Sequence, residues 1–98
     1  MLLAKVIGTV VSSQKDFRCE GRKLLLIQPH VTRGDGLAPS GGSVVAVDGV
    51  GAGQGSLVMY TQGSSARLTD VTRDTPIDSV IIGIVDAVVM NGRRIDTQ

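Results

Sequence analysis

The stretch SVVAVDGVGAGQGSLVMYT, residues 43–61, places two short runs of aliphatic and β-branched residues on either side of a glycine-rich segment. The runs Ser43–Val47 and Leu57–Thr61 have the length and composition of β-strands. Glycine occupies positions 49, 51, 53 and 55 between them. We therefore predict two strands joined by a glycine-rich connection, within reach of a hairpin-like pairing.

Further strands are predicted on both sides of this stretch. Leu2–Ser13 alternates with strand periodicity, and Leu24–Gln28 is a short apolar run that Pro29 should end. Ser79–Val89 is mostly β-branched and contains a glycine, which favours a strand over a helix. The Asn91-Gly92 pair is a hairpin signal, so Arg93–Asp96 should fold back as a terminal strand.

The remaining segments are predicted to be irregular. Gln14–Lys23 is polar, and His30–Gly42 contains four glycines and a proline, so both are expected to be exposed loops. Ser64–Leu68 is long enough for one helical turn with a serine N-cap, and Pro76 prevents a long helix. The fold class is therefore all-β: a single domain over residues 1–98, closed as a small OB-like antiparallel β-barrel of five to six strands with one short helical turn.

Composition limits the possible partners. The 98 residues are 42% hydrophobic but only 2% aromatic, so aliphatic side chains must fill the core, and the chain would gain by burying surface between subunits. A net charge of +1 provides no general attraction to nucleic acid or to an anionic membrane. Ile77–Met90, the most apolar stretch, is too short for a membrane helix and contains two aspartates. The single cysteine, Cys19, fits a reducing cytoplasmic location.

The glycine-rich segment fails the nucleotide-binding templates. A Walker motif ends in Lys-Ser or Lys-Thr, and residues 49–56 contain no lysine. A dinucleotide fingerprint needs a sixth-position glycine, which is Gln54 counted from Gly49 and Ser56 counted from Gly51. Cofactor binding is therefore not expected.

Catalytic and metal chemistry also find no support. The GSSAR cluster, residues 63–67, lacks the glycine that a nucleophile elbow places two residues after the serine. His30 is the only histidine and lies in a predicted loop, and Cys19 has no second cysteine for a shared metal site, so neither is assigned a role. We expect a protein that is not an enzyme and carries no metal.

An OB-like barrel raises a nucleotide-binding or single-stranded nucleic-acid-binding module as the alternative function. Such sites stack bases on aromatic side chains in a positively charged groove. Phe17 and Tyr60 are the only aromatic residues, and they fall on different predicted elements. The required chemistry is missing, so no nucleic-acid partner is expected.

The alternation of glycines has a different interpretation. Glycine at every second position would leave one side of an extended segment without side chains, so that another backbone could approach closely. A ligand would exploit such a surface, and so would subunits that converge on a symmetry axis.

Five segments in a fixed order then carry a specific resemblance. They are AKVIGTVVSSQK (4–15), KLLLIQP (23–29), VAVDGVGAGQG (45–55), GSSAR (63–67) and TPIDSVIIGIVD (75–86). Over nearly its whole length the sequence resembles the bacterial microcompartment vertex proteins of the ethanolamine-utilisation and carboxysome type. Many relatives have an acidic residue where this chain has Ser56, so a role for that charge is not carried over.

The resemblance implies a non-enzymatic shell protein with an OB-like barrel, located in the shell of a cytoplasmic bacterial microcompartment. It implies a homopentamer that caps the shell vertices beside hexameric and pseudohexameric shell proteins. The residues that we expect at a subunit interface or at the five-fold axis are Gly51, Gly53, Gly63, Ser64, Ser65, Ala66 and Arg67. For Arg67, binding of an anion remains an alternative.

Overall fold

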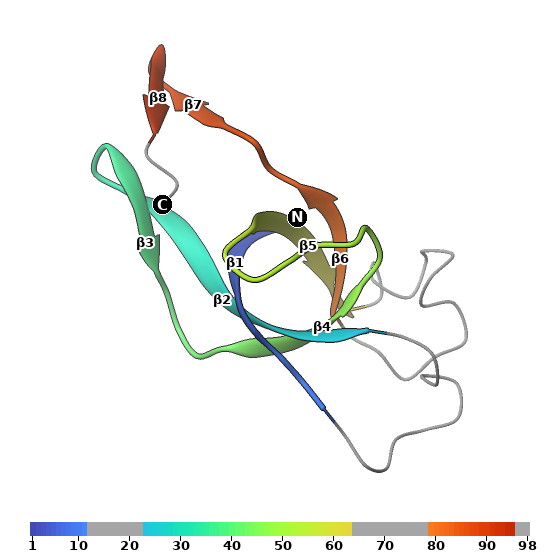
Figure 1. The fold of residues 1–98 in the computed structure, drawn as a ribbon. Helices are drawn as coiled ribbons and strands as arrows, with labels where there is room; N and C mark the ends of the chain where they lie inside the picture. Colours follow the sequence, from blue (N-terminus) through green and yellow to red (C-terminus); the bar gives the residue numbers. More distant parts are fainter. Residues whose placement is uncertain (12–22, 64–78, 96–98) are drawn as a thin grey trace.

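The computed structural model describes residues 1–11, 23–63 and 79–95 (Figure 1). These ranges contain eight β-strands and no helix. The strands are β1 (Leu2–Thr9), β2 (Leu24–Arg33), β3 (Gly36–Pro39), β4 (Val44–Asp48), β5 (Leu57–Gln62), β6 (Ser79–Ile84), β7 (Val88–Met90) and β8 (Arg93–Ile95). The predicted helical turn at Ser64–Leu68 lies outside the described residues.

Five strands form a closed barrel. The sheet order is β1-β5-β6-β4-β2-β3, and an additional pairing of β1 with β2 closes the ring (Figure 1). The predicted all-β barrel is therefore confirmed. The pairing of β4 with β6 is parallel, whereas the others in this sheet are antiparallel. β6 lies between β4 and β5, so the predicted hairpin-like pairing of those two strands was wrong.

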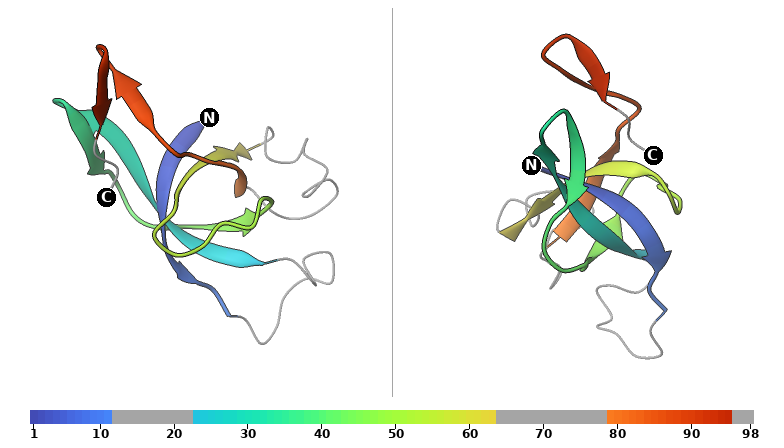
Figure 2. Two further views of the ribbon diagram at one scale, coloured as in Figure 1. Left: turned by 45° about the horizontal axis from the view of Figure 1, so that its top comes forward. Right: turned by 90° about the vertical axis from the view of Figure 1, so that its left-hand side faces the viewer.

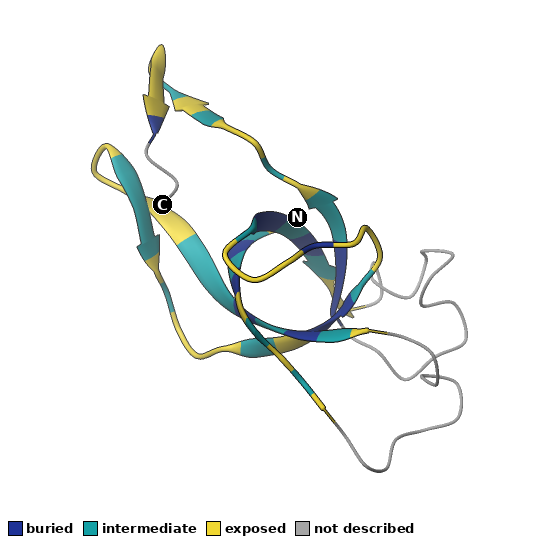
Figure 3. Ribbon diagram, in the orientation of Figure 1, coloured by how far each residue is buried: buried dark blue, intermediate teal, exposed yellow. Residues whose placement is uncertain are grey.

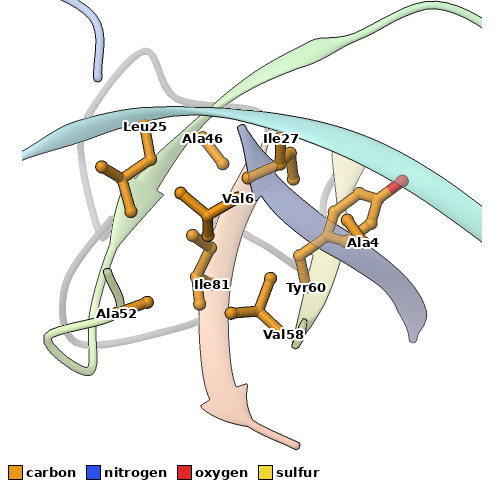
Figure 4. Close-up of a cluster of buried hydrophobic side chains, with 9 residues drawn as sticks. All are labelled: Ala4, Val6, Leu25, Ile27, Ala46, Ala52, Val58, Tyr60 and Ile81. Carbon is orange, nitrogen blue, oxygen red and sulfur yellow. The ribbon is translucent and has the colours of Figure 1, made fainter. Parts of the chain in front are cut away.

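Side chains from all five barrel strands fill the interior, with one contribution from the connection between β4 and β5. Strand alternation points every second residue inward, and the bulge between Val6 and Gly8 re-sets that alternation in β1. The cluster contains aliphatic residues and a single aromatic one (Figure 4). Its members are Ala4, Val6, Leu25, Ile27, Ala46, Ala52, Val58, Tyr60 and Ile81.

β2 continues through Pro29, where we predicted its end. The Pro29 carbonyl accepts a hydrogen bond from Ser40 N at 2.9 Å, so the proline nitrogen faces the same side of the strand. On that side, pairing with β4 ends at Ile27 and pairing with β3 begins at His30. Proline is tolerated there because it falls in the gap between two partner strands, where no N–H is required.

The predicted loop at residues 30–42 was likewise wrong over most of its length. Arg33 pairs with Gly36, so Gly34 and Asp35 form a two-residue turn between β2 and β3. Gly34 has a φ of 61°, as the first position of a Gly-X hairpin turn requires. The Gly-Asp pair was the sequence signal that could have revealed this hairpin.

The C-terminal strands form a separate two-stranded sheet, the β7–β8 hairpin, which projects beyond the barrel (Figure 2). The predicted Asn-Gly turn is confirmed, with φ of 54° at Asn91 and 76° at Gly92. The single strand predicted over Ser79–Val89 is instead interrupted after Ile84. Within the three described ranges, no helix has the length and apolar character to cross a membrane.

Candidate functional site

The glycine-rich loop, residues 49–56, crosses one end of the barrel between β4 and β5 (Figure 3). It is not the extended segment that the glycine alternation suggested. Ala52 is its buried member and belongs to the core cluster (Figure 4). The flanking Gly51 and Gly53 are exposed. The loop thus plugs the barrel with one methyl group and presents its backbone to the outside.

Asp48, the last residue of β4, organises the first half of the loop. Its side chain is only 2% exposed. Oδ1 accepts hydrogen bonds from the backbone nitrogens of Val50 at 3.0 Å, Gly51 at 3.0 Å and Ala52 at 3.2 Å. A carboxylate that accepts several backbone N–H bonds is among the stronger local restraints on a turn. Sequence reasoning missed this residue, although an aspartate before a Gly-X-Gly segment is typical of such a turn.

Lys23 adds a second restraint to the same half of the loop. Its Nζ donates a hydrogen bond to the carbonyl oxygen of Ala52 at 3.2 Å and lies 3.9 Å from Oδ2 of Asp48. The lysine side chain is about half exposed, so water weakens the ion pair. Its main effect is to position the Ala52 carbonyl.

The second half of the loop is a tight turn from Gly53 to Ser56. Ser56 N donates to Gly53 O at 3.1 Å, and Ser56 Oγ accepts from Gly53 N at 3.4 Å. Gly55 has a φ of 89°, a backbone conformation that is strained for a residue with a side chain. Two further bonds fix the turn to β1: Gly55 N donates to Val6 O at 2.8 Å, and Val6 N donates to Ser56 O at 2.9 Å. Ser56 therefore has a local structural role.

The glycines of the loop have different reasons to be glycine. Gly51 has a φ of 80°, so its backbone conformation alone disfavours any side chain. Gly53 has no positive φ, and a Cβ built on it would meet no atom within 4 Å among the described residues beyond its two chain neighbours. Nothing in the described part of the chain requires glycine at position 53.

The structure describes three of the seven predicted site residues. Gly51 and Gly53 lie together on the exposed side of the loop, whereas Gly63, which has a φ of 68°, follows the far end of β5. Ser64, Ser65, Ala66 and Arg67 lie outside the described residues. The two parts of the predicted site are therefore not brought together by what the structure describes.

The residues considered for other chemistry are placed as follows. Tyr60 is buried in the core, which raises the pKa of its hydroxyl and removes its ring from any base-stacking surface. His30, predicted to lie in a loop without a partner, is instead on β2, with Nδ1 2.8 Å from the carbonyl oxygen of Gln28. Among the described residues, no three His, Cys, Asp or Glu side chains gather as a metal site. Cys19 and Phe17 lie outside the described ranges.

Comparison with known proteins identifies the family. The sequence profile described as "Ethanolamine utilisation protein EutN/carboxysome" matches residues 1–86. This chain belongs to the EutN/CcmL family. The resemblance found in the five sequence segments is therefore confirmed.

Individual relatives agree with this assignment. The bacterial microcompartment shell vertex protein GrpN of Rhodospirillum rubrum is 44% identical over 88 residues, covering 90% of this chain and 96% of GrpN. The solved structure of Gloeobacter violaceus CcmL has a TM-score of 0.86 at 41% identity and covers 96% of this chain and 94% of its own. The structure titled "GrpN pentameric microcompartment shell protein" has a TM-score of 0.78 at 43% identity, covering 92% and 98%.

These EutN/CcmL relatives support one of the two functions that the sequence left open. The relatives are named as shell vertex proteins of carboxysomes and other microcompartments. They support a structural role in a shell rather than the alternative of nucleic-acid binding.

Proposed function

We propose that this chain is a non-enzymatic shell protein that forms homopentamers, and that these pentamers cap the vertices of a bacterial microcompartment. Flat layers of six-fold tiles cannot close into a polyhedron, so five-fold units must supply the curvature at each vertex. Head-to-tail contacts between identical subunits close such a ring when the rotation between neighbours is one fifth of a turn. Hexameric and pseudohexameric shell proteins are the partners around each pentamer.

The observation that carries the site assignment is the open space at Gly53. In the described part of the chain, neither backbone conformation nor packing requires glycine at position 53, a property it shares with Gly36 and Gly42. Because Gly53 also lies on an exposed and restrained loop, this suggests a constraint from outside the subunit. A neighbouring backbone that packs on the exposed side of the loop would supply that constraint. We therefore place a subunit contact at Gly51 and Gly53.

The rigidity of the loop supports this assignment. Asp48, Lys23 and Val6 hold it from three different elements of the chain. A surface that is ordered before association loses less entropy on binding than a mobile one. Val50, 39% exposed on the same loop, adds apolar surface that a neighbour would cover.

Gly63, Ser64, Ser65, Ala66 and Arg67 belong to the same proposal. The positive φ of Gly63 lets the chain turn directly after β5, and the GSSAR segment then follows. We assign these residues to the subunit interface or the five-fold axis. In the alternative role, Arg67 binds an anion there.

Native mass spectrometry and sedimentation of the purified chain test the assembly. We expect a species of five times the 10.2 kDa monomer mass. A strictly monomeric protein across micromolar concentrations would contradict the proposal. Other stoichiometries would contradict it equally.

The vertex role is tested by reconstitution with hexameric shell proteins. Electron microscopy should show closed polyhedra when the chain is present, and open or elongated assemblies when it is left out. Gly53→Val serves as the matched variant, because its monomer should fold normally while its pentamer fails. Closed shells that form equally well without the chain would exclude a vertex function.

A further inference from the structure

Among the described residues, the β7–β8 hairpin makes few contacts with the strands of the barrel. β7 and β8 pair with one another, but neither packs broadly on a barrel strand. All three views show the hairpin beyond the barrel (Figures 1 and 2). An isolated two-stranded hairpin is marginally stable in water, even with a favourable Asn-Gly turn. This hairpin therefore needs a partner surface.

One face of the hairpin is available for such a partner. Val88 pairs with Ile95, and Ile95 is buried, so this face is covered. Val89 pairs with Arg94 on the opposite face, where Val89 is 66% exposed. The aliphatic part of the arginine side chain extends the apolar surface of the valine. The open face is thus small and apolar, with a positive charge at its edge.

The outside of the barrel offers a matching surface. Gly8, Leu26 and Val45 are aligned in register across β1, β2 and β4. Val45 is 48% exposed, and Ile7, in the bulge beside Gly8, is 42% exposed. Gly8 adds no side chain to this surface, and a Cβ built there would lie 3.9 Å from Cβ of Leu26. We call this row, Ile7, Gly8, Leu26 and Val45, the outer apolar row.

We propose that the β7–β8 hairpin of each subunit docks through Val89 and Arg94 on the outer apolar row of a neighbouring copy. A closed ring needs two different, complementary surfaces on every subunit, and the hairpin and the row are two such surfaces. The solved structure of the relative GrpN is titled as a pentameric shell protein, which favours a second copy of this chain as the partner of the hairpin. The inference rests on the proposed function and adds to it an interface distinct from the glycine-rich loop. The family profile matches residues 1–86, so it includes the outer apolar row but not the hairpin residues Val89 and Arg94.

A charge-exchange experiment on the full chain tests the docking. Val89→Glu and Val45→Lys each place a charge in the contact, and each should weaken pentamer formation at least tenfold in sedimentation. The double variant should recover most of that loss, because the two new charges would face each other. Both positions are exposed in the monomer, so the far-ultraviolet circular dichroism should stay unchanged. Val31→Glu is the matched control, since Val31 is 41% exposed but lies on β2 beyond the outer apolar row, and its pentamer should be unaffected.

The outcomes separate this inference from the proposed function. A wild-type chain that stays monomeric would overturn both. A Val89→Glu pentamer as stable as wild type, or a double variant no better than the single ones, would overturn the docking and leave the pentamer intact. If Val89→Glu spared the pentamer but blocked its entry into shells, the hairpin would contact a hexameric tile, and docking on a second copy would again be excluded.

Discussion

The carboxylate of Asp48 accepts a hydrogen bond from the backbone nitrogen of Gly51 at 3.0 Å, and two neighbouring backbone nitrogens share the same oxygen. This side chain substitutes for the ladder partner that the chain loses when it leaves β4. A loop composed largely of glycine would otherwise lose much conformational entropy on ordering.

Asp48→Ala should therefore lower the free energy of unfolding by about 2–3 kcal/mol, because three N–H groups lose their shared acceptor. Asp48→Asn keeps an oxygen in place and should cost about 1 kcal/mol. Urea titration followed by circular dichroism measures both. Asp86→Ala is the control, since Asp86 is exposed, and it should change stability by less than about 0.5 kcal/mol. An Asp48→Ala variant as stable as wild type would show that the loop does not depend on this carboxylate.

Gly51→Ala should mainly lower the stability of the monomer, whereas Gly53→Ala should mainly weaken the pentamer. Alanine at position 51 must adopt a φ near 80°, so the monomer should lose about 1–2 kcal/mol of stability. Alanine at position 53 would have open space around its Cβ in the described part of the chain, so monomer stability should be unchanged while the pentamer weakens. Thermal unfolding of dilute protein, paired with native mass spectrometry, separates the two effects. Equal assembly of Gly53→Ala and wild type would remove position 53 from the interface.

The buried position of Ala52 at the end of the barrel should not accept a larger side chain. Ala52→Leu adds three carbons to a fully buried position and should cost about 1–3 kcal/mol through overpacking. Val50→Leu, on the exposed side of the same loop, adds one carbon without crowding and should be nearly neutral. Chemical denaturation compares them. Equal stability of the two variants would mean that the loop does not plug the barrel.

Burial of Tyr60 predicts a loss of stability in alkaline solution. The pKa of its hydroxyl is raised above 10.0 in the folded state because burial disfavours the phenolate. Above pH 10 the unfolded chain releases the proton while the folded chain retains it, so the free energy of unfolding falls as pH rises. Tyr60→Phe cannot ionise, so this part of the alkaline decline should disappear from its profile. Parallel alkaline profiles for the two proteins would contradict the assignment.

Sequence patterns predicted most strands because β-branched runs and an Asn-Gly turn are local signals. They did not predict which strands pair: the insertion of β6 between β4 and β5 depends on contacts far apart in the chain. Pro29 was wrongly predicted to end β2, because whether a proline ends a strand depends on which side of the strand lacks a partner.

The conformation of the glycine-rich loop was not predicted from the sequence. The glycine count pointed to residues 51 and 53, but a repeat of two suggested an extended segment where the chain makes two turns. Why each position holds a glycine can be judged only from the backbone angle φ and from the space that a Cβ atom would have there. The role of Asp48 required the positions of three backbone nitrogens.

The position of β6 also sets the order of events during synthesis. β4 and β5 leave the ribosome early, yet each keeps an unpaired edge until residues 79–84 arrive between them. Closure must therefore wait for β6, and it depends on contacts distant in sequence, which form slowly. A nascent chain cannot complete the barrel, and so cannot offer a finished subunit to a ring, until residues 79–84 have been translated.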